Sequence, residues 1–144
     1  GYAGTVQTDG DGQHDPAYLS AVVEPVASGR LDMCIGSRFI THEGFQTSFM
    51  RRVGIRFLSG MIRLLCGRKV LDVTSGFRAT NAEMTAFFAR HYATDYPEPE
   101  AILSASLAGY RVGEAPVKSV YYMVKVSLSL VIDRLAIKRS RRGK

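Results

Sequence analysis

The stretch that most constrains this chain is TDGDGQHDP, which runs from Thr8 to Pro16. Asp9 and Asp11 are separated by a single glycine, so their carboxylates can point to one place if the backbone bends between them. Gly10 and Gly12 permit that bend because they carry no side chain. Paired carboxylate oxygens suit Mg²⁺ or Mn²⁺, which leave coordination positions open for the phosphates of a substrate. The stretch therefore predicts a metal-binding turn.

The residues on either side of this turn predict a strand, a helix and a second strand. Thr5–Thr8 is expected to form a short strand, and residues 16–27 a helix with Asp15 as its N-cap. Asp32–Ser37 is expected to form a short, buried strand. This order is typical of a βαβ crossover, which predicts an α/β fold with a parallel sheet.

In parallel sheets of this kind, ligands bind beyond the carboxyl ends of the strands. Asp9 and Asp11 follow the first expected strand, and Arg38 follows the second. A guanidinium at such an edge can hold two phosphate oxygens at once. We therefore expect these three side chains to share one phosphate-binding site.

The rest of the chain predicts further helices and short strands. Helices are expected over residues 48–66, 82–90, 98–108 and 120–138, and strands over 77–79 and 111–117. The longest uncharged run of the last helix, Val126–Ile132, is far shorter than the ~20 residues that a membrane-spanning helix needs. We therefore expect that helix to lie on a membrane surface.

The helix expected over residues 48–66 is apolar around most of its circumference. One face is formed by Met50, Val53, Phe57, Met61, Leu64 and Leu65, and it is widened by Ile55, Leu58 and Ile62. Arg52, Arg56 and Arg63 form a polar stripe. Two interpretations remain open, because such a helix can be a core element or can rest on a membrane surface.

The net charge of +6 is concentrated at the C-terminal end of the chain. Six positive residues and one acidic residue give the segment 133–144 a net charge of +5, which leaves +1 for the remainder. A nearly neutral body argues against nucleic-acid binding. A basic tail next to an interfacial helix predicts contact with an anionic membrane surface. We therefore divide the chain into a globular part, 1–118, and a membrane-surface helix with a basic tail, 119–144.

Four short motifs occur in a fixed order: DGDGQHDP, IGSRF, TSGFRA and DYPEPE. Together they resemble the family 2 glycosyltransferases, and within that family the branch related to dolichyl-phosphate mannose synthase. The resemblance covers residues 2–118. It implies the GT-A fold, a Rossmann-like, mostly parallel sheet flanked by helices. It also implies that the family's N-terminal nucleotide-binding half is absent from this chain, so we expect these 144 residues alone to be inactive.

The resemblance assigns the phosphate and metal side of a sugar-transfer site. Asp11 is the expected metal ligand, with Asp9 and Gln13 completing the protein's share of the Mg²⁺ or Mn²⁺ shell or contacting the donor. Arg38 and Arg52 are expected to bind phosphate. The alternative for both arginines is a solvated side chain.

The resemblance also assigns an acceptor side. Ser75 and Gly76 are expected to form an acceptor-binding turn, and Arg78 to hold the acceptor's phosphate. Glu98 and Glu100 are the candidates for a catalytic base, or for acceptor contacts. Simpler interpretations stay open, because Arg78 can form a structural salt bridge and acidic residues at a helix start favour the helix dipole.

The implied activity is a metal-dependent, inverting transfer of a hexose from a nucleotide-diphosphate sugar. The expected acceptor is a polyprenyl phosphate of the dolichyl type, at the cytoplasmic face of the membrane. Such an enzyme would be peripheral, with no nucleic-acid partner. Two alternatives are a family 2 enzyme that uses a hydroxyl acceptor, and a non-catalytic membrane-surface module that keeps the fold.

Overall fold

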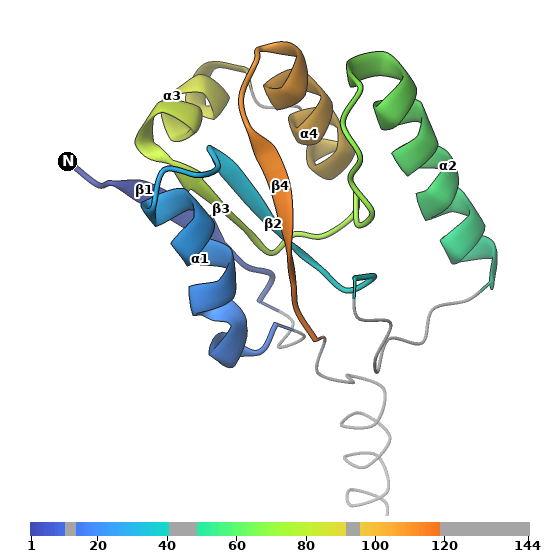
Figure 1. Cartoon of the computed structure of the whole chain (residues 1–144), viewed down its shortest axis with the longest axis horizontal. Helices are drawn as coiled ribbons and strands as arrows, with labels where there is room; N and C mark the ends of the chain where they lie inside the picture. Colours follow the sequence, from blue (N-terminus) through green and yellow to red (C-terminus); the bar gives the residue numbers. More distant parts are fainter. Residues whose placement is uncertain (11–13, 41–48, 92–95, 119–144) are drawn as a thin grey trace, which may run out of the picture.

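The computed structural model describes residues 1–10, 14–40, 49–91 and 96–118 (Figure 1). These residues form an α/β fold with four strands and four α-helices. The strands are β1 (Gly4–Gln7), β2 (Met33–Ser37), β3 (Arg78–Asn81) and β4 (Val112–Pro116). The helices are α1 (Leu19–Ala27), α2 (Phe49–Cys66), α3 (Ala82–His91) and α4 (Pro97–Leu107), with a 3-10 turn at Pro16–Tyr18. The expected helix at 120–138, the proposed unit 119–144 and the side chains of Asp11 and Gln13 lie outside the described residues.

The four strands form one mixed sheet in the order β1-β3-β2-β4. β2 and β4 are parallel, but β3 is antiparallel to both β1 and β2. The expected mostly parallel pairing is therefore wrong, since one of the three neighbouring pairs is parallel. The physical reason is that β3 inserts between β1 and β2 and keeps them from pairing. The carboxyl ends of β1, β2 and β4 and the amino end of β3 consequently meet at one edge, which we call the site edge.

Helices cover both faces of the sheet (Figure 1). α1 packs on one face, where Val22 contacts a cluster that includes Cys34, Phe77 and Ala115. α3 and α4 cover the other face, where Met84 and Ile102 pack with Met33 and Ile35. α2 lies outside α4 and completes this second cluster. The sheet is thus the middle layer of the molecule.

Local sequence signals account for the ends of α1. Asp15 caps the 3-10 turn that leads into the helix, and its Oδ1 accepts a hydrogen bond from the backbone N–H of Ala17 at 2.9 Å. Gly29 ends the helix in the left-handed region, with φ of 72°, which favours glycine. The cap at Asp15 was correctly predicted because it depends only on residues that are close in the sequence.

The buried side of α2 differs from the expected one. Ile55 and Ile62, which were expected only to widen the apolar face, are each 4% exposed and belong to the core. The six side chains expected to form the main face are exposed: Met50, Val53, Phe57, Met61, Leu64 and Leu65. α2 is therefore a core element through Ile55 and Ile62, while the described part of the chain does not bury the six-residue face. The reason is that α2 is the outermost helix and packs against the protein on one side only.

Away from the site edge, Asp32 joins the starts of β2 and β4. Its carboxylate accepts hydrogen bonds from the backbone N–H of Arg111 at 2.7 Å, from that residue's guanidinium and from the side chain of Asn81. The hydrogen bond from the Arg111 side chain holds the pKa of Asp32 below its ordinary value, and burial opposes that shift. The ionised carboxylate is therefore the form that stabilises the fold.

We expect the substitution Asp32→Asn to lower the free energy of unfolding at neutral pH by about 1 kcal/mol. A group with a lowered pKa contributes stability above its unfolded pKa and loses it as the pH falls. The difference between the variant and the wild type should therefore shrink as the pH drops below about 4. Urea denaturation at a series of pH values measures it, and a difference that stays constant down to acid pH would contradict the assignment.

Candidate functional site

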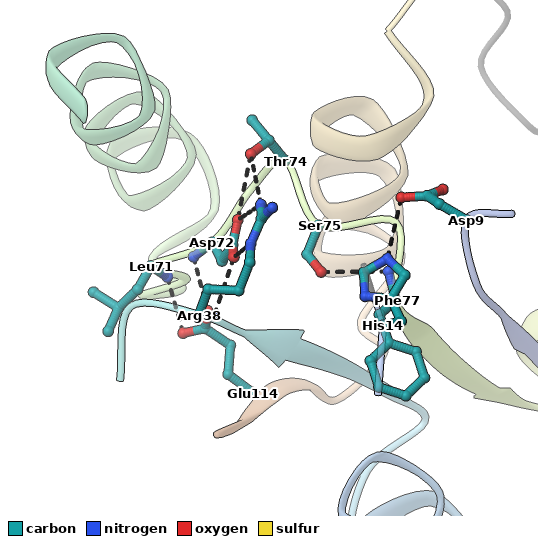
Figure 2. A network of polar contacts seen from close by, with 9 residues as sticks. All are labelled: Asp9, His14, Arg38, Leu71, Asp72, Thr74, Ser75, Phe77 and Glu114. Carbon is teal, nitrogen blue, oxygen red and sulfur yellow. Dashed lines mark hydrogen bonds and ion pairs between the residues drawn. The ribbon is translucent and has the colours of Figure 1, made fainter. Parts of the chain in front are cut away.

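Asp9 stands at the site edge, directly after β1. Its Oδ2 is 3.2 Å from Nε2 of His14, whose side chain is 9% exposed, while the Asp9 side chain is 50% exposed. The His14 ring in turn lies against Phe77, with ring centroids 5.0 Å apart (Figure 2). The half-exposed carboxylate of Asp9 is thus positioned by the nearly buried imidazole of His14. Asp9 can offer its free oxygen lone pairs to a ligand outside the fold.

Gly76 brings the TSGFRA segment against this carboxylate. A Cβ atom added at Gly76 would lie 2.7 Å from Cγ of Asp9, which is far inside van der Waals contact. The bare backbone at Gly76 is therefore a cradle that the Asp9 carboxylate occupies. The two motifs that the sequence placed in one site are in direct contact, although Gly76 was expected to bind the acceptor.

Arg38 makes a buried ion pair with Asp72 (Figure 2). The Nε and Nη2 atoms of Arg38 donate to the two carboxylate oxygens of Asp72 at 2.7 and 2.9 Å, and the backbone N–H of Arg38 donates at 3.1 Å. Asp72 is fully buried and Arg38 is 7% exposed. Most of the hydrogen-bonding capacity of this guanidinium is thus used inside the protein. Phosphate binding by Arg38 stays a prediction.

A second carboxylate supports this pair from β4. Glu114 accepts hydrogen bonds from the backbone N–H groups of Leu71 and Asp72 at 2.9 and 2.8 Å. It thereby fixes the segment that enters the TSGFRA turn. Neither Asp72 nor Glu114 was singled out in the sequence. The available signal was that a buried arginine at a strand end requires a buried counter-ion.

The turn before β3 is held by its own hydrogen bonds. Ser75 is 2% exposed, and its hydroxyl accepts a hydrogen bond from the backbone N–H of Phe77 at 3.3 Å. The buried hydroxyl shapes the turn that positions Gly76. An acceptor-binding role for Ser75 stays a prediction.

Arg78 and Glu98 bring the DYPEPE segment to the same edge. Nη2 of Arg78, at the start of β3, is 4.0 Å from Oε1 of Glu98 in the first turn of α4. The Arg78 side chain is 3% exposed and lines a cavity of 150 Å³ together with Thr5, Gln7 and Thr80. Glu100 lies in the same turn of α4 and is exposed. The structure therefore brings the side chains of Arg78 and Glu98 close to each other.

Arg52 lines a second cavity, of 410 Å³, beside the site edge. The lining residues that the structure describes are Phe39, Arg52, Ile55, Arg56, Ser59, Lys69 and Leu71. They include three cationic side chains, no carboxylate and an apolar wall. Such a lining suits a ligand with an anionic head and an apolar body.

The described residues supply part of the expected metal site. Among them, no cluster of three or more His, Cys, Asp or Glu side chains is arranged to hold a metal ion. Asp9 fits a ligand role, because its carboxylate is half-exposed and seated on the cradle at Gly76. Asp11 and Gln13 lie outside the described residues, so their part stays a prediction.

Comparison with known proteins identifies several relatives, including two that are named as enzymes. The chain is 33% identical over 116 residues to an uncharacterized protein of Methanocaldococcus jannaschii, and the match covers 78% of the chain and 48% of the relative. It is 29% identical over 119 residues to a UDP-N-acetylglucosamine–dolichyl-phosphate N-acetylglucosaminyltransferase of Methanococcus voltae, with coverages of 81% and 47%. It is 33% identical over 85 residues to a polyprenol monophosphomannose synthase of Mycolicibacterium smegmatis, with coverages of 58% and 32%.

The chain spans about half the length of the first two of these relatives and a third of the last. No family model matches it. In the described part of the chain, no helix combines the length and the apolar character that crossing a membrane requires.

Proposed function

We propose that this chain is part of a metal-dependent, inverting glycosyltransferase of the GT-A type. It transfers a hexose from a nucleotide-diphosphate sugar to a polyprenyl phosphate at the cytoplasmic face of a membrane, where it acts as a peripheral protein. The observation that carries the proposal is the contact between Asp9 and Gly76, which joins the acidic motif to the TSGFRA turn at the site edge. The names of two relatives, which act on dolichyl phosphate and form a polyprenol-linked mannose, support the choice of acceptor.

The reaction is a single displacement at the anomeric carbon of the sugar. An oxygen of the acceptor phosphate attacks on the face opposite the nucleotide diphosphate, and the new C–O bond forms as the bond to the diphosphate breaks. The diphosphate leaves with the electron pair and gains negative charge. A divalent ion held by Asp9, Asp11 and Gln13 would neutralise that charge.

The residues of the chain itself orient the reactants. Asp9, whose carboxylate contacts His14 and Gly76, lies on the side of the site that binds the sugar donor. The cations that line the larger cavity, Arg52 among them, suit the acceptor phosphate, and the apolar wall suits the first isoprene units. Arg38 is anchored by Asp72, and the next residue, Phe39, lines this cavity.

Glu98 and Glu100 are not required as bases under this proposal. A phosphate oxygen is already anionic, so no proton has to be removed before it attacks, whereas a hydroxyl acceptor needs a base. The 4.0 Å contact of Glu98 with Arg78 instead positions that arginine beside the turn.

The proposal is tested by a transfer assay on the protein that carries this chain. Labelled nucleotide-diphosphate hexoses are incubated with polyprenyl phosphate and Mg²⁺ or Mn²⁺, and the organic phase is examined for a glycolipid with an acid-labile sugar phosphate bond. We expect labelled lipid whose anomeric configuration is the inverse of the donor's. Transfer to hydroxyl acceptors alone, or retained configuration, would contradict it.

A further inference from the structure

Asp9 and His14 are both held against the segment that precedes β3, by two separate contacts. The carboxylate of Asp9 lies on the bare backbone of Gly76, where an added Cβ atom would come within 2.7 Å of Cγ. The ring of His14 lies against the ring of Phe77, the next residue of the same segment (Figure 2). The TSGFRA segment therefore holds the acidic turn at two points.

The ring of His14 is fixed from both sides. Asp15, the next residue in the chain, caps the 3-10 turn before α1 and so restrains the backbone of His14. Phe77 is 2% exposed and belongs to the cluster between α1 and the sheet. Its carbonyl also accepts a hydrogen bond from the backbone N–H of Gly36 in β2 at 2.8 Å. His14 thus rests on a side chain that cannot move without disturbing the core.

The Nε2 atom of His14 is directed at Asp9. It lies 3.2 Å from Oδ2, and because a carboxylate only accepts hydrogen bonds, Nε2 is the donor. The His14 side chain is 9% exposed, whereas the Asp9 side chain is 50% exposed. The imidazole therefore serves the carboxylate, and the carboxylate is the member of the pair that a ligand can reach.

We propose that His14, held in place by Phe77, is the positioning residue that sets the affinity of Asp9 for its divalent ion. This inference rests on the proposed function, in which Asp9 is a metal ligand. A hydrogen bond from a fixed donor restricts the rotation of the carboxylate, so its remaining lone pairs keep one direction. Partners of this kind orient a metal ligand before the metal binds, and their loss weakens binding.

The proposal divides the TSGFRA motif between the two faces of the sheet. Gly76 contacts Asp9 at the site edge. Phe77 contacts His14 on the face that α1 covers. The next side chain, Arg78, approaches α4 on the opposite face. The glycine and the phenylalanine thus support the metal ligand, although the motif as a whole was expected to bind the acceptor.

The test measures Mn²⁺ binding by the protein that carries this chain, from the electron paramagnetic resonance signal of the free ion. We expect His14→Ala to bind Mn²⁺ about 10–100-fold more weakly than the wild type. His14→Gln should bind nearly as the wild type does, because its amide nitrogen is as many bonds from Cβ as Nε2 of histidine. In His14→Asn the nitrogen is one bond closer to Cβ and cannot reach Asp9, so this variant should resemble His14→Ala.

The pair of amide variants separates positioning from packing. Both variants remove the ring from Phe77, so a general loss of packing would affect them equally. The matched control is His91→Ala, because His91 also stacks on a phenylalanine, Phe87, with ring centroids 4.9 Å apart, but belongs to α3 on the other face of the sheet. The control should bind Mn²⁺ as the wild type does, and circular dichroism should show every variant folded.

The part played by Phe77 is tested by adding Phe77→Leu to the wild type and to His14→Ala. The substitution should weaken Mn²⁺ binding in the wild type and have no further effect where the His14 ring is missing. Equal weakening in both proteins would show that Phe77 does not act through His14.

Transfer kinetics distinguish a positioning residue from a catalytic one. In His14→Ala, the Mn²⁺ concentration that gives half-maximal transfer should rise about 10–100-fold, while the rate at saturating Mn²⁺ stays within about threefold of the wild type. A rate that stays low at every Mn²⁺ concentration would overturn the inference. So would wild-type Mn²⁺ affinity in His14→Ala, or equal affinities in the two amide variants. A wild type that binds no Mn²⁺ is a distinct result, which refutes the proposed metal site and this inference with it.

Discussion

Replacing Asp72 by alanine is expected to lower the free energy of unfolding by about 3–5 kcal/mol, since it leaves a buried guanidinium without its counter-ion. Asp72 is fully buried and accepts three hydrogen bonds from Arg38. Arg38 is only 7% exposed, so the variant leaves its positive charge largely buried with its main partner removed. Urea denaturation of the protein that carries this chain measures the change.

The matched control is the exposed ion pair of Glu24 with Arg30, whose side chains are 61% and 63% exposed. Pairs of this kind contribute about 0–1 kcal/mol because water and salt screen them. Glu24→Ala should therefore change the free energy of unfolding by less than Asp72→Ala. Equal effects of the two substitutions would mean that the Arg38–Asp72 pair is not buried as described.

Replacing Gly76 by alanine is expected to reduce transfer activity about 100-fold, because it displaces the carboxylate of Asp9 from its cradle. The added Cβ would lie 2.7 Å from Cγ of Asp9, so that side chain must move. Asp9 is half-exposed and free to turn toward solvent, so stability should change much less than activity. The measurement is kcat/KM for the transfer reaction, together with the thermal unfolding temperature.

Gly54→Ala is the control for this substitution, since a Cβ at Gly54 meets no other atom. It should leave transfer unchanged and raise the free energy of unfolding by about 0.5–1 kcal/mol, as expected for alanine in an exposed helix interior. Full activity of Gly76→Ala would show that the position of Asp9 does not matter to the reaction.

The sequence predicted the features that depend on near neighbours. The cap at Asp15, the end of α1 at Ala27 and the positions of β1, β2 and β4 follow from local spacing and local conformational preference. The pairing of β3 between β1 and β2 could not be predicted in this way, because it is determined by contacts between residues far apart in the chain. The parallel crossover suggested a parallel sheet, and the inserted strand made it mixed.

The candidate site likewise combines residues that local motifs predicted with contacts that depend on residues far apart in the chain. Asp9 and Gly76 were each selected from a motif, but their contact depends on how the turn before β3 meets the end of β1. Asp72 lies in an apolar sequence and carries no motif that marks it as the partner of Arg38. On α2, apolar residues cover most of the circumference, so their spacing alone could not identify which side is buried. Only the packing against α4 identified it.

We propose that the turn after β1 binds the divalent ion that makes transfer possible. The most direct test measures the rate of sugar transfer by the Asp11→Asn variant over a series of Mg²⁺ and Mn²⁺ concentrations, with Asp15→Asn as control. Asparagine replaces aspartate well as an N-cap, so the control keeps the helix start while removing a nearby charge.

We predict that Asp11→Asn loses at least about 100-fold in rate at every metal concentration, while Asp15→Asn keeps the metal dependence of the wild type. Transfer by Asp11→Asn at the wild-type rate, or wild-type transfer that persists after chelation of all divalent ions, would contradict the claim.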